Sequence, residues 1–191
     1  MSREATEMTV ETVTLEVPDS KTIHLKWPEG YDVNFKTGQF ITCFWPDEPS
    51  YKRAYSLSSC ALDRGFYEFT VKRDGKMGTR IVDWIKPGTK MMVLPPTGKF
   101  LPVYEPDKHL VCIAGGSGVT PFRAFVREAT RQKLQTKITI LYSVRTTTPG
   151  RWLGQPSSPT GVAYPATLGL RRSARWAAAC CGRCCPGFPV P

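Results

Sequence analysis

Histidine is scarce in this sequence. His24 and His109 are the only two among 191 residues, and neither lies near any motif considered below. Histidine is the side chain that proteins use most often as a general acid or base. Its scarcity therefore agrees with a function that needs no acid–base pair from the protein.

Long apolar runs and an apolar N-terminus are also absent. No stretch of about 18 consecutive apolar residues occurs, so a transmembrane helix and a membrane association are not expected. Residues 1–11 are acidic and lack the apolar centre of a signal peptide. These absences predict a cytoplasmic protein, in which Cys43, Cys60 and Cys112 are reduced thiols of the core.

Residues 146–191 lack Lys, Asp, Glu, Ile, Asn, His and Met but contain seven Pro, six Gly, six Ala and four of the seven Cys. This composition is typical of a linker or a disordered tail. A frameshift after Arg145 is a second explanation, because the missing residues mostly have A/T-rich codons. Cys181 and Cys184 have the CxxC spacing of a metal site, but no second pair or His accompanies them. No metal site is predicted.

The formal net charge of +10 is unevenly distributed. Five arginines of residues 146–191 contribute half of it, which leaves +5 on residues 1–145. A mild excess of positive charge suits an anionic cofactor or an acidic protein partner. The sequence pattern indicates basic residues that are scattered and not clustered on one helix, so nucleic-acid binding is not expected.

Residues 1–103 carry the pattern of a β protein. Apolar and polar residues alternate over 13–17, 23–27 and 67–71, as in half-buried strands. Denser apolar runs at 39–45 and 91–94 predict more buried strands, and residues 79–86 fit one short helix. Short strands separated by Pro- and Gly-containing turns predict an antiparallel barrel or sandwich.

Residues 104–145 change to the pattern of an α/β protein. The unbroken apolar run at 110–114 predicts a parallel strand that is covered on both faces. Apolar residues between Phe122 and Ala129 recur on one helical face, and residues 138–144 fit a second strand. The order strand, helix, strand predicts a βαβ unit.

A glycine-rich turn, Gly115–Gly118, lies between the first of these strands and the helix. Thr120 is the expected N-cap and Pro121 the first helical residue. Glycines at a strand end let a phosphate approach the backbone, and a helix N-terminus offers it free N–H groups. The turn departs from the dinucleotide fingerprint, since Pro121 stands at the third glycine position. The alternative is a tight turn that merely requires glycine.

Three motifs together resemble the ferredoxin–NADP reductase family: Arg53–Ser56 (RAYS), Gly75–Thr79 and AGGSGVTP, ending at Pro121. The resemblance covers roughly residues 8–145. It implies a six-stranded antiparallel Greek-key FAD-binding β-barrel at 1–103 and a truncated parallel βαβ NAD(P)-binding domain at 104–145. The Pro/Gly/Ala/Arg/Cys-rich tail at 146–191 has no counterpart.

The resemblance also implies roles for individual residues. Arg53 would pair with the flavin phosphate, since its planar guanidinium grips two phosphate oxygens. Tyr55 would lie along the isoalloxazine ring and Ser56 would hydrogen-bond flavin N5, which places both at the catalytic centre. Thr79, as the start of the short helix, would hold phosphate, and Arg145 would face either the adenosine ribose or solvent. The implied cofactor-binding residues are Arg53, Ala54, Tyr55, Ser56, Val71, Lys72, Gly78, Thr79, Gly115, Gly116, Ser117, Gly118, Val119, Thr120 and Arg145.

The implied function is the transfer of hydride from NAD(P)H to bound FAD, and of electrons onward to a ferredoxin-like or oxygenase iron–sulfur protein. FAD is favoured over FMN because residues 71–79 resemble the pyrophosphate-binding segment. The choice between NADH and NADPH, the individual acceptor and the oligomeric state stay open. Two alternatives remain: a flavin-binding barrel without reductase activity, because the nucleotide domain is truncated, and a non-enzymatic β-barrel interaction domain.

Overall fold

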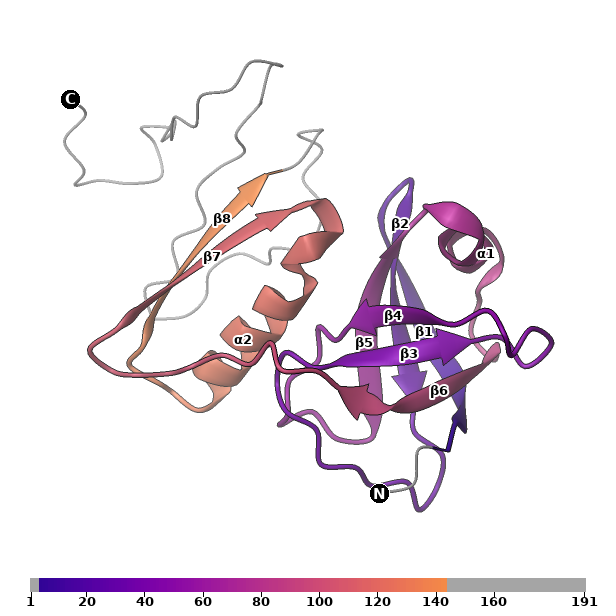
Figure 1. Ribbon diagram of the computed structural model, residues 1–191, viewed down its shortest axis with the longest axis horizontal. Helices are drawn as coiled ribbons and strands as arrows, with labels where there is room; N and C mark the ends of the chain where they lie inside the picture. The colour runs from indigo at the N-terminus through magenta and orange to yellow at the C-terminus, as the bar shows by residue number, and fades with distance from the viewer. Residues whose placement is uncertain (1–3, 144–191) are drawn as a thin grey trace.

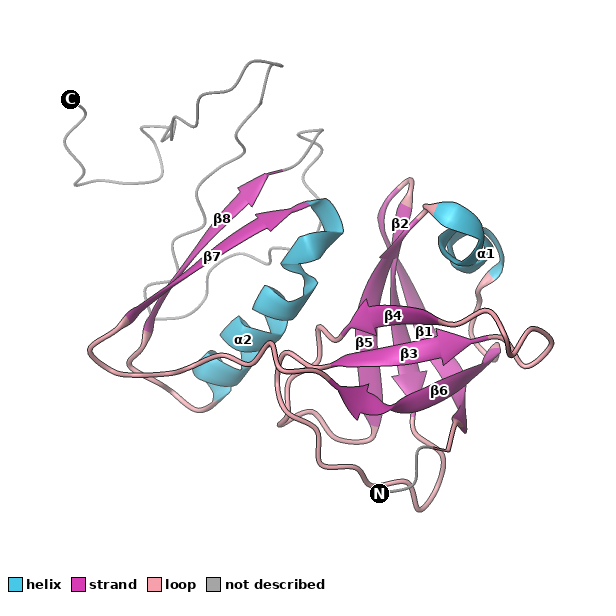
Figure 2. Ribbon diagram, viewed as in Figure 1, coloured by secondary structure: helices cyan, strands magenta, loops and turns pink. Residues whose placement is uncertain are grey.

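The computed structural model describes residues 4–143, which form a β-sheet domain followed by a smaller α/β unit (Figure 1, Figure 2). Val144 of the predicted last strand, Arg145 and the whole of 146–191 lie outside the described residues. The predictions made for these positions, including the CxxC pair and the frameshift, are therefore not examined by the structure.

The first domain is built on one curled antiparallel sheet. Its strands are β1 (Thr6–Val17), β2 (Ser20–Lys26), β3 (Phe40–Phe44), β4 (Arg53–Ser56), β5 (Phe66–Lys72) and β6 (Lys90–Thr97). Their order is β4-β3-β6-β1-β2-β5, which confirms the six antiparallel strands. The edge strands β4 and β5 approach each other at one bridge, between Leu57 and Phe69. No ladder joins them in the described residues, so the barrel is not closed.

The core of this domain lies inside the curled sheet. Ile23 and Leu25 of β2 and Tyr67 and Phe69 of β5 are fully buried, as the two-residue alternation predicts. Each such side chain contributes roughly 1.5–3 kcal/mol on burial. The prediction is less good for β1, where Leu15 is 60% exposed. Leu15 lies near the turn into β2, beyond the part of β1 that pairs with β6.

Helix α1 (Gly75–Trp84) connects β5 to β6. Ile81, Val82 and Ile85 are buried against the sheet, as expected. The helix begins at Gly75 and not at Thr79, so the predicted boundary is wrong by four residues. Helix propensity does not predict a start at Gly75, because the first turn contains two glycines, which disfavour helix.

The second unit is a βαβ unit, as predicted. Strand β7 (His109–Gly115) pairs in parallel with β8 (Lys137–Ser143), and the 3-10 helix η1 (Gly116–Val119) leads directly into α2 (Thr120–Arg131). Thr120 is not the N-cap: it is the first residue of α2, and its hydroxyl donates to the Ser117 carbonyl oxygen at 2.6 Å. The glycine turn is thus itself helical and extends α2 toward β7.

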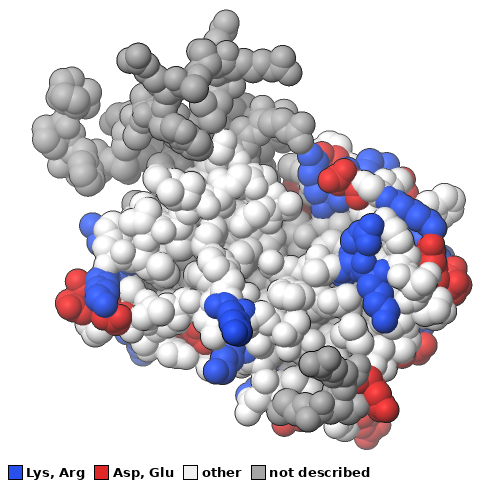
Figure 3. All heavy atoms as spheres, viewed as in Figure 1, with Lys and Arg blue, Asp and Glu red and all other residues white. Residues whose placement is uncertain are grey.

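One face of the β7–β8 sheet packs on α2 and the other does not pack on any described element. Phe125, Ala129 and Ile140 are buried on the α2 side. Val111 and Ile113 are 51% and 65% exposed in the described part of the chain, so the expectation of a strand covered on both faces is wrong there. On the one face of the molecule that Figure 3 shows, a broad area near the centre carries no Lys, Arg, Asp or Glu side chains.

Three remaining expectations are settled by the described residues. Cys43, Cys60 and Cys112 are buried free thiols, as predicted. No helix in residues 4–143 is long and apolar enough to cross a membrane.

The expectation that basic residues are scattered is wrong for α2, where Arg123, Arg127 and Arg131 follow one another at intervals of four and contact the first domain.

Candidate functional site

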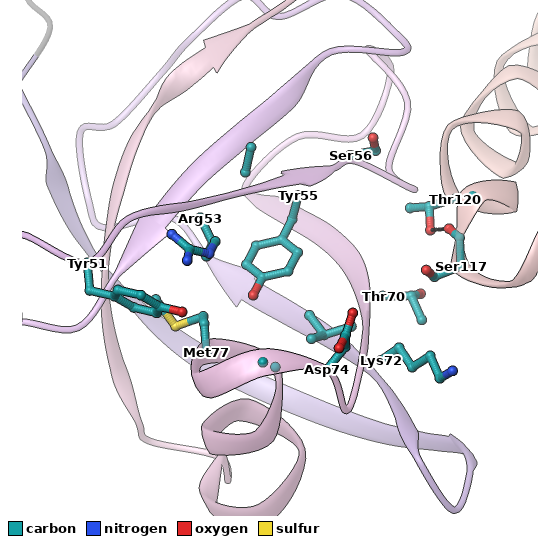
Figure 4. A pocket seen from close by; sticks show the side chains of 15 residues that line it. Tyr51, Arg53, Tyr55, Ser56, Thr70, Lys72, Asp74, Met77, Ser117 and Thr120 are labelled. Carbon is teal, nitrogen blue, oxygen red and sulfur yellow. Dashed lines mark hydrogen bonds between the residues drawn. The ribbon is translucent and has the colours of Figure 1, made fainter.

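A cleft of about 530 Å³ lies between the two units (Figure 4). Its walls come from β4 and the loop before it, from the end of β5 with the start of α1, and from η1 with the start of α2. The lining residues are Tyr51, Arg53, Ala54, Tyr55, Ser56, Thr70, Val71, Lys72, Asp74, Gly75, Met77, Gly78, Ser117, Gly118 and Thr120. Three motifs that are far apart in the sequence therefore meet at one cavity.

Most of the residues predicted for the site line this cleft: Arg53, Ala54, Tyr55, Ser56, Val71, Lys72, Gly78, Ser117, Gly118 and Thr120. Thr79, Gly115, Gly116 and Val119 do not line it, and Arg145 lies outside the described residues. Tyr51, Thr70 and Asp74 line the cleft but were not predicted. A signal existed for Tyr51 and Thr70, because in an extended chain each shares a face with a predicted neighbour two residues away, Arg53 or Lys72.

Arg53 is the first residue of β4 and brings an exposed guanidinium to the cleft. Its Cζ atom lies 4.0 Å from the centroid of the Tyr51 ring, and its Nη1 donates to the Lys52 carbonyl oxygen at 2.8 Å. Among the described residues no carboxylate forms an ion pair with it. The charge of Arg53 is thus held in place by an aromatic face and stays available for an anionic group.

Tyr55 forms an aromatic wall in the centre of the cleft. Its ring stacks on the buried Phe69 ring, with centroids 5.1 Å apart and planes at 26°. In Figure 4 Tyr55 projects between Arg53 and the group formed by Thr70, Lys72 and Asp74. Burial raises the pKa of the Tyr55 phenol above its ordinary value. The phenol therefore keeps its proton at neutral pH and can donate a hydrogen bond.

The N-terminus of α1 opens onto the cleft. The first four N–H groups of a helix have no acceptor within the helix and carry its positive dipole end, and here they belong to the N-cap Asp74 and to Gly75, Lys76 and Met77. Gly75 has φ +59°, a conformation that glycine adopts without strain. The Asp74 side chain makes no capping hydrogen bond to this turn, so these amides are not closed off by it.

Thr79 does not have the position expected of it. It is the fifth residue of α1 and is exposed, outside the lining of the cleft. The amides that can hold a phosphate lie one turn earlier than predicted.

A second helix N-terminus faces the cleft from the other unit. Ser117 of η1 and Thr120 of α2 lie opposite Ser56 in Figure 4, and Gly118 of η1 lines the cleft with them. Gly116 has φ +50° and starts the turn. A methyl group built on Gly118 meets no atom within 4 Å, so its backbone is open to a ligand. A helix N-terminus of this kind binds anions.

The charges around the cleft are mixed. Arg53 and Lys72 are its cations and Asp74 is its acid. Lys72 Nζ is 3.7 Å from the Asp19 carboxylate, which reduces the charge it offers to a ligand. The volume falls in the range of about 300–1,000 Å³ that is usual for cofactor sites. The arrangement suits an elongated ligand that combines an aromatic ring with phosphates.

Comparison with known proteins identifies the same two units. Residues 7–101 match the family model "Oxidoreductase FAD-binding domain", and residues 112–149 match "Oxidoreductase NAD-binding domain". The chain belongs to the ferredoxin–NADP reductase family. Its cleft thus lies at the boundary between an FAD-binding and an NAD-binding domain.

Two relatives are reductase components of oxygenase systems. The chain is 26% identical over 157 residues to terephthalate 1,2-dioxygenase reductase component 1 of Comamonas sp. The alignment covers 81% of this chain and 42% of the relative. It is 33% identical over 132 residues to the ferredoxin reductase component of 3-ketosteroid-9-alpha-monooxygenase from Mycolicibacterium smegmatis. This alignment covers 64% of this chain and 37% of the relative. The chain therefore spans about two fifths of the length of these relatives.

A solved structure also resembles the chain. The ferredoxin NADP+ reductase of Neisseria gonorrhoeae, with bound FAD and NADP, superimposes with a TM-score of 0.64 at 26% identity, covering 76% of this chain and 59% of that protein. The likeness extends over both units of the described structure.

Proposed function

We propose that this chain is an NAD(P)H-dependent flavoprotein reductase that binds FAD in the cleft. The observation that carries the proposal is the meeting of the RAYS strand, the α1 N-terminus and the η1–α2 N-terminus around one cavity. Each of the three supplies a different part of a flavin and nucleotide site. The membership of the family supports the same assignment.

The residues of the cleft fit FAD. Arg53 has no carboxylate partner among the described residues and can grip phosphate oxygens. The open amides of Gly75, Lys76 and Met77 would form a second phosphate site on the same wall, which favours a pyrophosphate and hence FAD over FMN. Tyr55 offers an aromatic face with a protonated phenol, and Ser56 a hydroxyl beside it. Bound FAD would supply the chemistry, which is acceptance of a hydride and release of single electrons.

NAD(P)H would enter from the side of the second unit. The amides of Ser117 and Gly118 and the dipole of α2 would hold its phosphates, while Thr120 keeps the turn helical through its bond to Ser117. Val71 and Lys72 lie at the α1 end of the cleft and would hold the adenosine part of FAD. Gly115 and Val119 are the N-cap and the last residue of η1 and do not line the cleft. The protein's contribution is thus position and charge.

The electron acceptor is proposed to be a ferredoxin-like or oxygenase iron–sulfur protein. Support comes from the two relatives, whose names describe reductase components of a dioxygenase and a monooxygenase. The mild positive charge of residues 1–145 suits an acidic partner. A cytoplasmic location belongs to the same proposal, because the free thiols Cys43, Cys60 and Cys112 suit a reducing compartment.

The visible spectrum of the purified 191-residue chain tests the proposal. We expect a flavin band that bleaches on anaerobic addition of NADPH or NADH, and the nucleotide that bleaches it faster is the preferred one. A flavin band that persists would favour the first alternative, a flavin-binding barrel without reductase activity. A colourless protein that takes up no added FAD would overturn the proposal and leave the non-enzymatic interaction domain.

A further inference from the structure

An arginine stripe runs along the side of α2 that faces the first domain. It consists of Arg123, Arg127 and Arg131, which are four residues apart and therefore follow one another along the helix. The apolar side of α2 packs on β7 and β8 instead. The stripe thus adds a second, charged contact surface to the same helix.

Two acidic residues of the first domain form ion pairs with this stripe. Glu68 of β5 accepts hydrogen bonds from Arg123 and, at 2.9 Å, from Arg127. Asp63, in the loop between β4 and β5, pairs with Arg131 and lies 3.3 Å from Arg127. Arg127 therefore bridges the two carboxylates, and the set forms one connected network between the domains.

Both carboxylates are held in fixed positions by their own domain. The Asp63 side chain is 1% exposed and accepts a hydrogen bond from the Cys60 backbone N–H at 2.8 Å. Glu68 is 14% exposed and accepts one from the Ser58 hydroxyl at 2.8 Å. Burial of a carboxylate is unfavourable unless it is paired and hydrogen-bonded. The arginines of α2 therefore supply the positive partners of two carboxylates that the first domain already holds in place.

The network adjoins the cleft. Glu68 lies on the same face of β5 as Thr70 and Lys72, which line the cleft. Arg123 is three residues after Thr120 and so belongs to the first turn of α2. A cation in that turn opposes the positive dipole end of the helix, and its contact with Glu68 offsets this. The pair thus joins the β5 wall of the cleft to the helix start that forms the opposite wall.

An apolar contact between the domains lies nearby. Gly38 of the first domain packs closely against the Phe100 backbone and the Phe125 ring of α2. A Cβ added to Gly38 would lie 2.1 Å from the Phe100 carbonyl oxygen and 2.8 Å from the Phe125 ring. Phe100 and Phe122 also contact each other, with ring centroids 5.8 Å apart. Apolar contacts are not directional, so they hold α2 near the first domain without fixing its orientation. Hydrogen-bonded ion pairs do fix it.

We propose that Glu68 and Asp63 are positioning residues, which orient α2 so that the η1 turn stays opposite Ser56 and Tyr55 across the cleft; for the nucleotide this rests on the proposed function. Glu68 carries most of the effect, because it is the carboxylate that pairs with Arg123 in the first turn of α2, whereas Asp63 pairs with Arg127 and Arg131 further along the helix. In this arrangement FAD binding depends on the first domain, whereas delivery of hydride depends on the network as well.

The test compares Glu68→Gln with the wild-type 191-residue chain. We expect FAD affinity, measured by quenching of flavin fluorescence, to stay within about twofold. Amide hydrogen exchange across residues 116–123 should become about tenfold faster, as expected for the loss of a coupled pair. Anaerobic flavin reduction by NAD(P)H should slow by a similar factor, while reduction by dithionite stays unchanged.

Two further variants separate positioning from general stability. Asp83→Asn removes a more exposed ion pair, with Arg73, that lies within the first domain, and it should leave exchange at 116–123 unchanged. Arg123→Gln removes only the Arg123–Glu68 pair, whereas Glu68→Gln also removes the pair with Arg127. Arg123→Gln should therefore act in the same direction but less strongly, and the loss in the double variant should be smaller than the sum of the two single losses.

The outcomes distinguish the two proposals. If exchange at 116–123 and flavin reduction in Glu68→Gln match the wild type, the positioning role is overturned. If the wild type binds FAD but is not reduced by NAD(P)H, the proposed function fails, and the exchange data still decide whether the network orients α2. A loss of FAD affinity in Glu68→Gln equal to the loss of reduction would also overturn the positioning role.

Discussion

Gly78 of α1 passes so close to Lys72 of β5 that a Cβ added to Gly78 would lie 2.4 Å from the Lys72 carbonyl oxygen. This contact sets how closely the first turn of α1 docks on the end of β5. It places the start of α1, with the open amides that precede Gly78, beside Lys72 at the cleft. A glycine that lowers helix propensity is thus used where the helix must approach a strand.

Gly78→Ala should displace α1 and weaken FAD binding. Overpacking of this kind costs about 1–3 kcal/mol and outweighs the gain of about 1 kcal/mol in helix propensity. We expect a lower free energy of unfolding in urea and weaker FAD binding by fluorescence titration. Retention of both at wild-type levels would contradict the close approach.

Thr79→Ala is the matched control for Gly78→Ala. Thr79 is the next residue in the same helix, is exposed and does not line the cleft. Alanine is the better helix former, by a few tenths of a kcal/mol or about 0.5 at most. Stability should therefore stay the same or rise slightly, with unchanged FAD affinity. A clear loss of FAD affinity would restore the phosphate-binding role that the sequence suggests for the Thr79 hydroxyl.

Gly118→Ala should separate nucleotide binding from folding. A methyl group at Gly118 meets no protein atom within 4 Å, so the fold should tolerate it. Reduced freedom of the unfolded chain can even stabilise such a variant by about 0.4–1 kcal/mol. The methyl group would nevertheless stand where a phosphate must approach the backbone. We expect an unchanged melting temperature and FAD affinity, with a higher NAD(P)H concentration needed for half-maximal rate of flavin reduction.

Gly116→Ala offers the contrasting case in the same turn. Gly116 has φ +50°, which strains any residue with a Cβ, and it does not line the cleft. This variant should lose stability first, and nucleotide binding only through that loss. Equal effects of the two substitutions on nucleotide use would argue against close approach at Gly118.

Arg53→Ala should weaken FAD binding strongly. A hydrogen bond to a charged group contributes about 1.5–3 kcal/mol, which corresponds to about 10- to 150-fold in Kd. Arg53→Lys should recover only part of this, because a lysine lacks the two-pronged donor of arginine. Titration of the apoprotein with FAD measures both effects.

Lys52→Ala is the matched control for Arg53. Lys52 is adjacent and also exposed, but its Nζ lies over the Phe44 ring, 5.0 Å from the centroid, and it does not line the cleft. It changes the net charge by the same amount. If Lys52→Ala weakens FAD binding as much as Arg53→Ala, the effect is one of overall charge and not of a phosphate contact.

The strands and the βαβ unit follow directly from sequence periodicity. In β5, Tyr67, Phe69 and Val71 alternate with polar residues, and the structure buries the first set. The motif at Arg53–Ser56 and the glycine turn likewise lie at the cleft. These features depend on local pattern, which a sequence displays.

The features that sequence reasoning missed depend on contacts between distant segments. The start of α1 is fixed by the approach of Gly78 to Lys72, against the helix propensity of its own first turn. Glu68 and Arg123 are 55 residues apart in the chain. No local sequence pattern around either residue indicates that the two pair. The spacing of Arg123, Arg127 and Arg131 nevertheless indicates a charged stripe on the helix.

The thiol of Cys112 predicts a pH dependence of stability. Burial raises the pKa of Cys112 from 9.0 to about 11, so the folded state keeps a proton that the unfolded state releases at lower pH. The stabilisation is therefore fully present below about pH 9 and is lost as the pH rises through about 11. Cys112→Ala lacks this proton, so its free energy of unfolding in urea should fall less steeply between pH 8 and 11 than that of the wild type. The other thiols are common to both proteins, and the cavity left by alanine lowers stability at every pH without changing the slope. Equal slopes would show that Cys112 titrates alike in the folded and unfolded chains.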